Sequence, residues 1–166
     1  MEKAHFGFYY DIETVREDGV VIDRDRVYNL IPVEGLNYII EAALRNSAAF
    51  PSIYVGLFEG AYTPVPGDTM AAFPGAATEL TAYAETTRQV VNLGAATGGV
   101  AESSAAKAVI TGNTNGKQAQ GAFISSSPTK GATTGVLLSA VRFPSPKPLD
   151  AGTVLRITCG FTAASV

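Results

Sequence analysis

Side chains that could carry nucleophilic or metal chemistry are scarce in this sequence of 166 residues. His5 is the only histidine and Cys159 the only cysteine. A hydrolase of the Ser/His/Asp or Cys/His type needs a histidine that a scaffold holds in place, and His5 is only a few residues from the start of the chain. A tetrahedral zinc site needs several cysteine or histidine ligands. We therefore expect no catalytic residue, no metal site, no cofactor and no enzymatic activity.

Three further side chains could belong to a site but have simpler interpretations. Glu79 and Glu85 could form a pair of catalytic carboxylates, yet fifteen acidic residues produce such pairs by chance. We interpret both as solvated surface residues. Arg88 is a candidate for a fixed ion pair at the rim of the fold, and an ordinary exposed arginine is an equally good interpretation.

The segment GNTNGKQ at residues 112–118 resembles a phosphate-binding loop. Only three residues separate its glycines, however, and Gln118 occupies the position of the magnesium-binding Ser or Thr. Its Asn-Gly dipeptide instead favours a tight turn. We expect a hairpin that joins strands at residues 107–111 and 117–125.

The charge pattern argues against nucleic-acid and membrane partners. Charged residues make up only 16% of the chain, compared with about 25% in typical soluble domains. Between residues 102 and 150 the basic residues are spread singly, whereas phosphate binding needs dense clusters. No run of eighteen apolar residues and no leader-like segment is visible. A single cysteine cannot form an intrachain disulfide, so we expect synthesis and folding in a cytoplasm.

Hydrophobic periodicity predicts one helix near residues 32–47, followed by a strand at residues 52–58. One face of the helix holds five apolar residues at helical spacing, namely Leu36, Ile39, Ile40, Ala43 and Leu44. Such a face needs a sheet to cover it. We therefore expect these five side chains in the core.

The first thirty residues predict a β-hairpin. Residues 5–12 alternate with a period of two, and a second strand follows at residues 20–23 or slightly beyond. Gly19 can adopt the positive φ of the turn between them. We expect this hairpin at the edge of the main sheet or as an arm that reaches a neighbouring subunit. Ordinary core packing of Phe6 and Phe8 is the alternative to a partner contact.

The rest of the chain predicts short strands and loops. Residues 60–81 are rich in Pro, Gly and Ala, which indicates an irregular loop held down by Tyr62, Met70 and Phe73. Further strands are expected at residues 86–93, 135–143 and 153–162. The last one places Cys159 on an apolar face with Leu155 and Ile157. The sequence thus predicts a single domain over residues 1–166. We expect a mostly β, antiparallel two-sheet β-sandwich, jelly-roll-like, whose helix covers an open end or one face.

Three long strings of the sequence resemble a family of small structural proteins of tailed bacteriophages and prophages. They are LIPVEGLNYIIEAALRN, then YVGLFEGAYTPVPGDTMAAFPGAATELTAYAETTRQ, and later GAFISSSPTKGATTGVLLSAVRFPSPKPLDAGTVLRITCGFT. The match of order and pattern covers nearly the whole chain. Two departures are a threonine at Thr153, where the family has an acid, and the lack of any tryptophan.

This resemblance implies a capsid decoration or cement protein, made in the bacterial host cytoplasm and located on the capsid exterior of the virion. Its partners would be the major capsid protein, whose subunits it would bridge, and further copies of itself in a dimer or trimer. Six residues of the hairpin and the long loop are the expected partner contacts, namely Phe6, Phe8, Tyr10, Tyr62, Met70 and Phe73.

A second interpretation is a tail-fibre or receptor-binding module that recognises host-surface glycan, since β-sandwiches carry many functions. Exposed aromatic side chains near Asp or Asn would favour glycan binding. Broad exposed apolar patches would favour a capsid partner.

Overall fold

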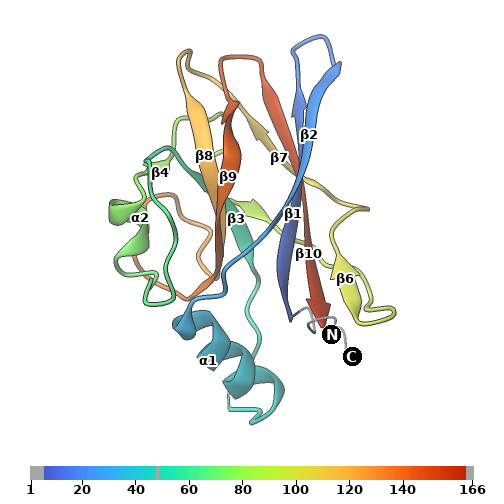
Figure 1. Ribbon diagram of the computed structural model, residues 1–166, viewed down its shortest axis with the longest axis vertical. Helices are drawn as coiled ribbons and strands as arrows, with labels where there is room; N and C mark the ends of the chain where they lie inside the picture. Colours follow the sequence, from blue (N-terminus) through green and yellow to red (C-terminus); the bar gives the residue numbers. More distant parts are fainter. Residues whose placement is uncertain (1–5, 48, 164–166) are drawn as a thin grey trace.

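The computed structural model describes residues 6–47 and 49–163, and it consists of two antiparallel β-sheets packed face to face (Figure 1). The elements in chain order are β1 (Phe6–Val15), β2 (Val21–Tyr28), α1 (Val33–Ala43), β3 (Tyr54–Phe58), α2 (Phe73–Ala76), β4 (Glu79–Leu80), β5 (Gln89–Val90), β6 (Val100–Glu102), β7 (Ala108–Thr111), β8 (Gln118–Ser125), β9 (Leu137–Pro148) and β10 (Val154–Ala163). Sheet 1 has the order β2-β1-β10-β6, and β7 also pairs with β10. Sheet 2 has the order β4-β3-β8-β9, and β5 also pairs with β3. The predicted two-sheet β-sandwich is confirmed.

Alternating apolar side chains build the core between the sheets. Tyr10 of β1 and Leu155 and Ile157 of β10 are fully buried, in one cluster with Val55 of sheet 2. Cys159 lies in the same cluster, as its position on the apolar face predicts. Burial raises the pKa of its thiol, so the thiol stays protonated and unreactive.

The predicted N-terminal hairpin is present and is built into sheet 1. Gly19 adopts a φ of 84° at its turn. β1 pairs with β10 over its whole length, from Phe6 opposite Ala163 to Val15 opposite Val154, while β2 forms the edge of the sheet. The hairpin is therefore part of sheet 1, with β2 at the edge as expected, and does not form an arm. His5, which the sequence places at the start of this strand, lies outside the described residues.

The predicted hairpin between β7 and β8 is wrong, because the two strands belong to different sheets. β7 pairs with β10, whereas β8 pairs with β3 and β9. The segment between them crosses between the sheets and hydrogen bonds to the crossing from β9 to β10. The Gly112 N–H donates to the Thr153 carbonyl at 2.8 Å, and the Gly116 N–H donates to Asp150 Oδ1 at 2.6 Å. Gly116 has the positive φ of a turn, but the turn closes against a neighbouring crossing and not against its own strand.

The loops contain more regular structure than expected. Residues 60–81 include α2 and β4, and the strand expected at residues 86–93 is limited to β5. β6 lies between the strands expected at residues 86–93 and 107–111, where the sequence predicts no strand. The predicted anchoring of the long loop is confirmed, since Met70 and Phe73 are fully buried and the Tyr62 ring packs edge-on against that of Phe73.

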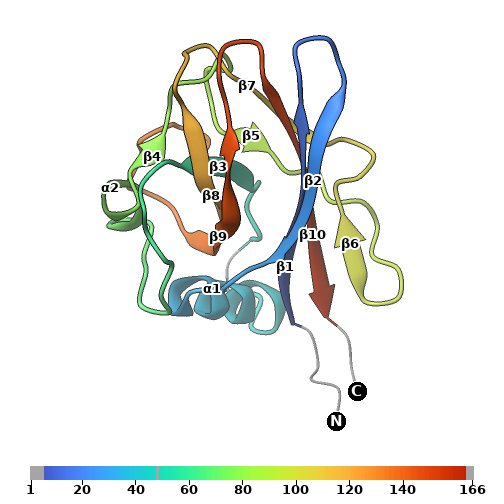
Figure 2. The ribbon, with the colours of Figure 1, turned by 45° about the horizontal axis from the view of Figure 1, so that its top comes forward.

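Helix α1 lies across one end of the sandwich, beside the start of β9 (Figure 2). The predicted helix is confirmed, but the prediction that its five-residue apolar face is buried is wrong. Leu44 is 80% exposed and Ile40 is 47% exposed, Ala43 is also exposed, and Leu36 and Ile39 are only partly buried. Within the helix only Gly35 is buried.

Candidate functional site

The first candidate site is an exposed apolar stripe along α1, formed by Val33, Ile40 and Leu44. We call it the α1 stripe. At about 100° per residue these three positions fall within roughly 40° of arc on the helix. Their exposed fractions are 51%, 47% and 80%. Phe50, which follows the helix, is half exposed and packs its ring against that of Tyr38. A row of large apolar side chains in water is typical of a protein-binding surface.

The orientation of α1 follows from its contacts with β9 and the long loop. A Cβ on Gly35 would lie 2.8 Å from the Leu137 carbonyl oxygen, so the helix backbone approaches the sheet directly at this glycine. Glu34 Oε2 accepts hydrogen bonds from the Met70 N–H at 2.9 Å and the Leu137 N–H at 2.7 Å. These contacts turn the Gly35 side of the helix towards the sheet. The α1 stripe is on the opposite side and faces solvent.

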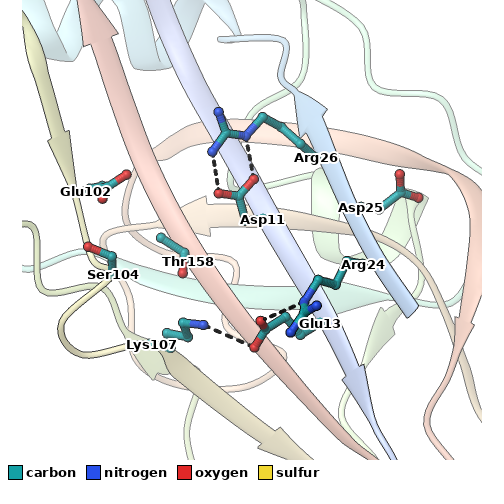
Figure 3. A pocket seen from close by; sticks show the side chains of 9 residues that line it. All are labelled: Asp11, Glu13, Arg24, Asp25, Arg26, Glu102, Ser104, Lys107 and Thr158. Carbon is teal, nitrogen blue, oxygen red and sulfur yellow. Dashed lines mark hydrogen bonds and ion pairs between the residues drawn. The ribbon is translucent and has the colours of Figure 1, made fainter. Parts of the chain in front are cut away.

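The second candidate site is a polar groove of about 480 Å³ on the outer face of sheet 1 (Figure 3). Its charged side chains come from neighbouring strands and the loop after β6. They are three carboxylates and three cations, namely Asp11, Glu13, Glu102, Arg24, Arg26 and Lys107, and the lining also includes Asp25 of β2. Ser104 and Thr158 add hydroxyl groups. We call this the outer groove.

Cross-strand ion pairs hold the outer groove in shape. Asp11 and Arg26 are direct partners in the β1–β2 register, and the guanidinium donates from Nε and Nη2 to the two carboxylate oxygens, each at 2.6 Å. Glu13 accepts from Arg24 Nε at 3.2 Å and from Lys107 Nζ at 3.1 Å. Lys107 thereby ties the loop after β6 to β1. Figure 3 shows the Asp11–Arg26 pair and the two partners of Glu13, with Glu102 on the other side of β10.

Tyr9 positions Glu102, which lies on the opposite side of the outer groove from Arg26. Its hydroxyl donates to Glu102 Oε2 at 2.5 Å. The ring covers Gly160, where a Cβ would come within 2.1 Å of the ring carbon Cζ. Burial, with the hydrogen bond to Glu102 as the next cause, raises the pKa of Tyr9 to about 12. The same hydrogen bond lowers the pKa of Glu102, so this side chain is a carboxylate at neutral pH.

Glu13 provides a test of the ion pairs in the outer groove. The hydrogen bond from Lys107, supported by Arg24, lowers the pKa of Glu13 below its ordinary value of 4.5. Because the unfolded chain then binds more protons in acid, this stabilisation is present above pH 4.5 and is lost as the pH falls through the lowered pKa. We expect Glu13→Gln to lower the free energy of unfolding by about 0.5 kcal/mol at pH 7 and to have no effect at pH 2, measured by urea denaturation. Glu17→Gln, in an exposed turn, is the control, and an equal loss at both pH values would contradict the prediction.

The six partner contacts expected from the sequence divide into two groups. Phe6 is 52% exposed and Tyr62 is partly buried, so these two reach the surface. The other four are buried in the cores of the chain itself, namely Phe8, Tyr10, Met70 and Phe73. The prediction that these four are surface contacts is corrected, because a side chain with almost no exposed area cannot contact a partner. Aromatic type alone does not distinguish an exposed anchor from a core residue.

The signals for both sites are visible in the sequence only in part. The apolar residues of the α1 stripe are evident from their spacing, but their exposure is not. The two acidic residues of β1 and the alternating Asp and Arg residues of β2 could have indicated cross-strand ion pairs. Glu102 and Lys107 carry no such signal, because they join the groove from a distant part of the chain.

Within residues 6–47 and 49–163 no group of three or more His, Cys, Asp or Glu side chains is arranged to hold a metal ion. Among the described helices, none is long and apolar enough to cross a membrane.

No protein-family model, no curated protein and no solved structure matches the chain. A β-sandwich is compatible with many unrelated functions, so the surfaces of this chain decide among them.

Proposed function

We propose that this chain is a virion structural protein, a capsid decoration or cement protein of a tailed phage. It binds the outer surface of the head and bridges major capsid protein subunits through the α1 stripe. The observation that carries the proposal is the exposure of Val33, Ile40 and Leu44 on a helix whose opposite side is fixed to the sandwich. The resemblance of the sequence to phage structural proteins supplies the identity of the partner.

The physical basis of the contact is the burial of apolar surface. Removing apolar area from water contributes about 25 cal/mol per Å², so one exposed leucine side chain contributes on the order of 2 kcal/mol when it is covered. Such a contact is weak by itself. A head carries many copies of its capsid protein, and a decoration protein that touches more than one subunit gains from avidity.

The edges of the two sheets favour face contacts over strand pairing between copies. If the β2 strands of two copies paired antiparallel about a two-fold axis, the residue on the axis would lie directly opposite the same residue of the other copy. An axis at any of residues 23–26 would therefore place two like charges opposite each other, which is unfavourable. The edge strand β9 carries Pro144 and Pro146, which have no N–H to donate to a further strand. A dimer or trimer of this chain on the head would therefore form through side-chain surfaces.

The test is binding to phage heads that lack the protein. We expect Leu44→Glu, alone or with Ile40→Glu, to reduce the amount that cosediments with heads at least tenfold, since each change places a charge where apolar area is covered. The matched control is Ile22→Glu, which changes an equally exposed isoleucine on β2. Thermal unfolding of each variant checks the fold. Full head occupancy by the Leu44→Glu protein, or binding to tails instead of heads, would overturn the proposal.

A further inference from the structure

The outer groove is separate from the surface used in the proposed function. Its residues come from β1, β2, β6, β10 and the loop after β6, all in or beside sheet 1. Helix α1 packs on β9 of sheet 2. A ligand in the outer groove and a partner on the α1 stripe therefore use different faces of the sandwich.

The charges of the outer groove balance. Asp11, Glu13 and Glu102 face Arg24, Arg26 and Lys107. Asp25 is not counted in this balance. It lies opposite the buried Ile12 in the β1–β2 register, and it shares Lys147 Nζ with Asp23, at 2.9 Å and 2.5 Å. A groove of this kind has no excess of charge with which to attract an anion such as phosphate or a metal cation. The chemistry favours an uncharged ligand that can both donate and accept hydrogen bonds.

The donors and acceptors of the outer groove are held in place before a ligand arrives. The bidentate pair with Asp11 uses two of the five N–H donors of the Arg26 guanidinium, and its plane is fixed by that pair. Glu102 is positioned by Tyr9 from the other side. A pair of neighbouring sugar hydroxyls can accept from a guanidinium and donate to a carboxylate at the same time. Groups that are already ordered lose little entropy when a ligand binds.

An aromatic ring stands beside these polar groups. Tyr28 is 59% exposed and follows Arg26 by two positions on β2, so both lie on the outer face of sheet 1. Its ring centroid lies 6.3 Å from that of Tyr9, which fixes the inner side of the ring. The exposed side offers an apolar surface to the C–H face of a pyranose ring. Tyr28 does not line the outer groove but a neighbouring depression with Phe6 and Asn29, so the ring is available to a saccharide that extends from the groove past Arg26.

We propose that the outer groove binds a neutral saccharide, with hexopyranose units of a surface polysaccharide as the ligand class. Arg26 and Lys107 donate hydrogen bonds to ring hydroxyls, Asp11 and Glu102 accept them, and Tyr28 stacks on the sugar. This inference does not depend on head binding, because it concerns a different face of the molecule.

The experiment is a titration of the isotope-labelled full chain, followed by two-dimensional NMR. The probes are the methyl glycosides of glucose, galactose, mannose and N-acetylglucosamine, and inorganic phosphate is the anionic comparison. We expect at least one glycoside to shift amide signals of β1, β2 and β10 around the outer groove, while those of α1 stay unchanged. We also expect Asp11→Asn and Glu102→Gln to weaken this binding at least fivefold each. The two variants lie on opposite sides of the groove, so the loss of folding in one leaves the other as a test.

Arg142→Gln, an exposed arginine in sheet 2, is the matched control and should bind as the parent does. The proposal is overturned if none of the four glycosides shifts groove signals up to 50 mM. It is also overturned if phosphate alone does so, or if both groove variants bind the glycoside as tightly as the control.

Discussion

Replacing Arg88 with alanine should lower the free energy of unfolding by about 3 to 5 kcal/mol, because it leaves a buried carboxylate without its partner. Arg88 is 1% exposed. Its guanidinium donates to Glu79 Oε1 at 2.8 Å and Glu79 Oε2 at 2.7 Å. It also donates to Ser125 Oγ and to the carbonyls of Ser127 and Ala132, at 3.1 to 3.2 Å. The arginine thereby fastens the loop between β8 and β9 to the segment between β4 and β5.

Urea denaturation of Arg88→Ala and three further variants separates the stabilisation due to the ion pair from that due to the surrounding packing. We expect Glu79→Gln to cost less than Arg88→Ala, since the amide oxygen still accepts a hydrogen bond. The combined change of both residues to methionine should recover part of the loss, because an apolar pair of similar volume needs no charge compensation. Arg45→Ala, which breaks an exposed pair with Glu41, should leave the unfolding midpoint almost unchanged. An Arg88→Ala protein as stable as the Arg45→Ala protein would contradict the prediction.

Replacing Gly121 with alanine should lower the free energy of unfolding by about 3 kcal/mol, through overpacking of the core. A Cβ at this position would lie 2.2 Å from the Val141 carbonyl oxygen and 2.2 Å from Cζ of Phe58. Phe58 is the direct cross-strand partner of Gly121 and is fully buried, so its ring cannot move aside without displacing other core residues. The backbone carbonyl cannot move without breaking the pairing of β8 with β9.

The control for this prediction is Gly75→Ala in α2. Nothing lies within 4 Å of a Cβ at that position, so alanine should leave the free energy of unfolding unchanged or raise it slightly. Thermal and urea denaturation of both variants give the comparison. Equal stability of the Gly121→Ala and Gly75→Ala proteins would show that β8 can relax around the added methyl group.

Within residues 6–47 and 49–163, the Gly121 site is one of three cross-strand pairs in which an aromatic ring covers a glycine. Phe123 covers Gly56 in the same pair of strands, β3 and β8, and Tyr9 covers Gly160 in sheet 1. In each case the absence of a Cβ lets the ring approach the backbone of the neighbouring strand closely. The pair in sheet 1 also places the Tyr9 hydroxyl at Glu102, so this packing contributes directly to the outer groove.

The features that could be predicted from the sequence are those that depend on neighbouring residues. The alternation of Leu155, Ile157 and Cys159 correctly predicted their burial on one face of β10. The turn at Gly19 correctly predicted the β1–β2 hairpin, since its geometry is set within a few residues. The class of fold followed from the number of short strands and from the single long helix.

The failures share a cause, which is that each depended on a partner distant in sequence. The turn at Gly116 is present, but whether it closes a hairpin depends on which sheet each flanking strand joins. The sequence favoured a solvated position for Glu79, which is wrong, and it left Arg88 open between an ion pair and an exposed side chain. The structure buries both residues as an ion pair, and the loop between β8 and β9 encloses them. Phe8 and Tyr10 share their residue types with surface anchors, and only the pairing of β1 with β10 places them in the core.

The sequence by itself determined the β-sandwich class, the helix, the N-terminal hairpin and the apolar faces of the long strands, because periodicity and turn chemistry act over a few residues. Only the tertiary structure decided which side of α1 meets solvent and which charges gather in the outer groove. Gly35 and Glu34 fix the helix on β9, and Lys107 and Glu102 reach β1 from another part of the chain. Both candidate sites depend on contacts between segments far apart in sequence, and a local sequence pattern does not indicate such contacts.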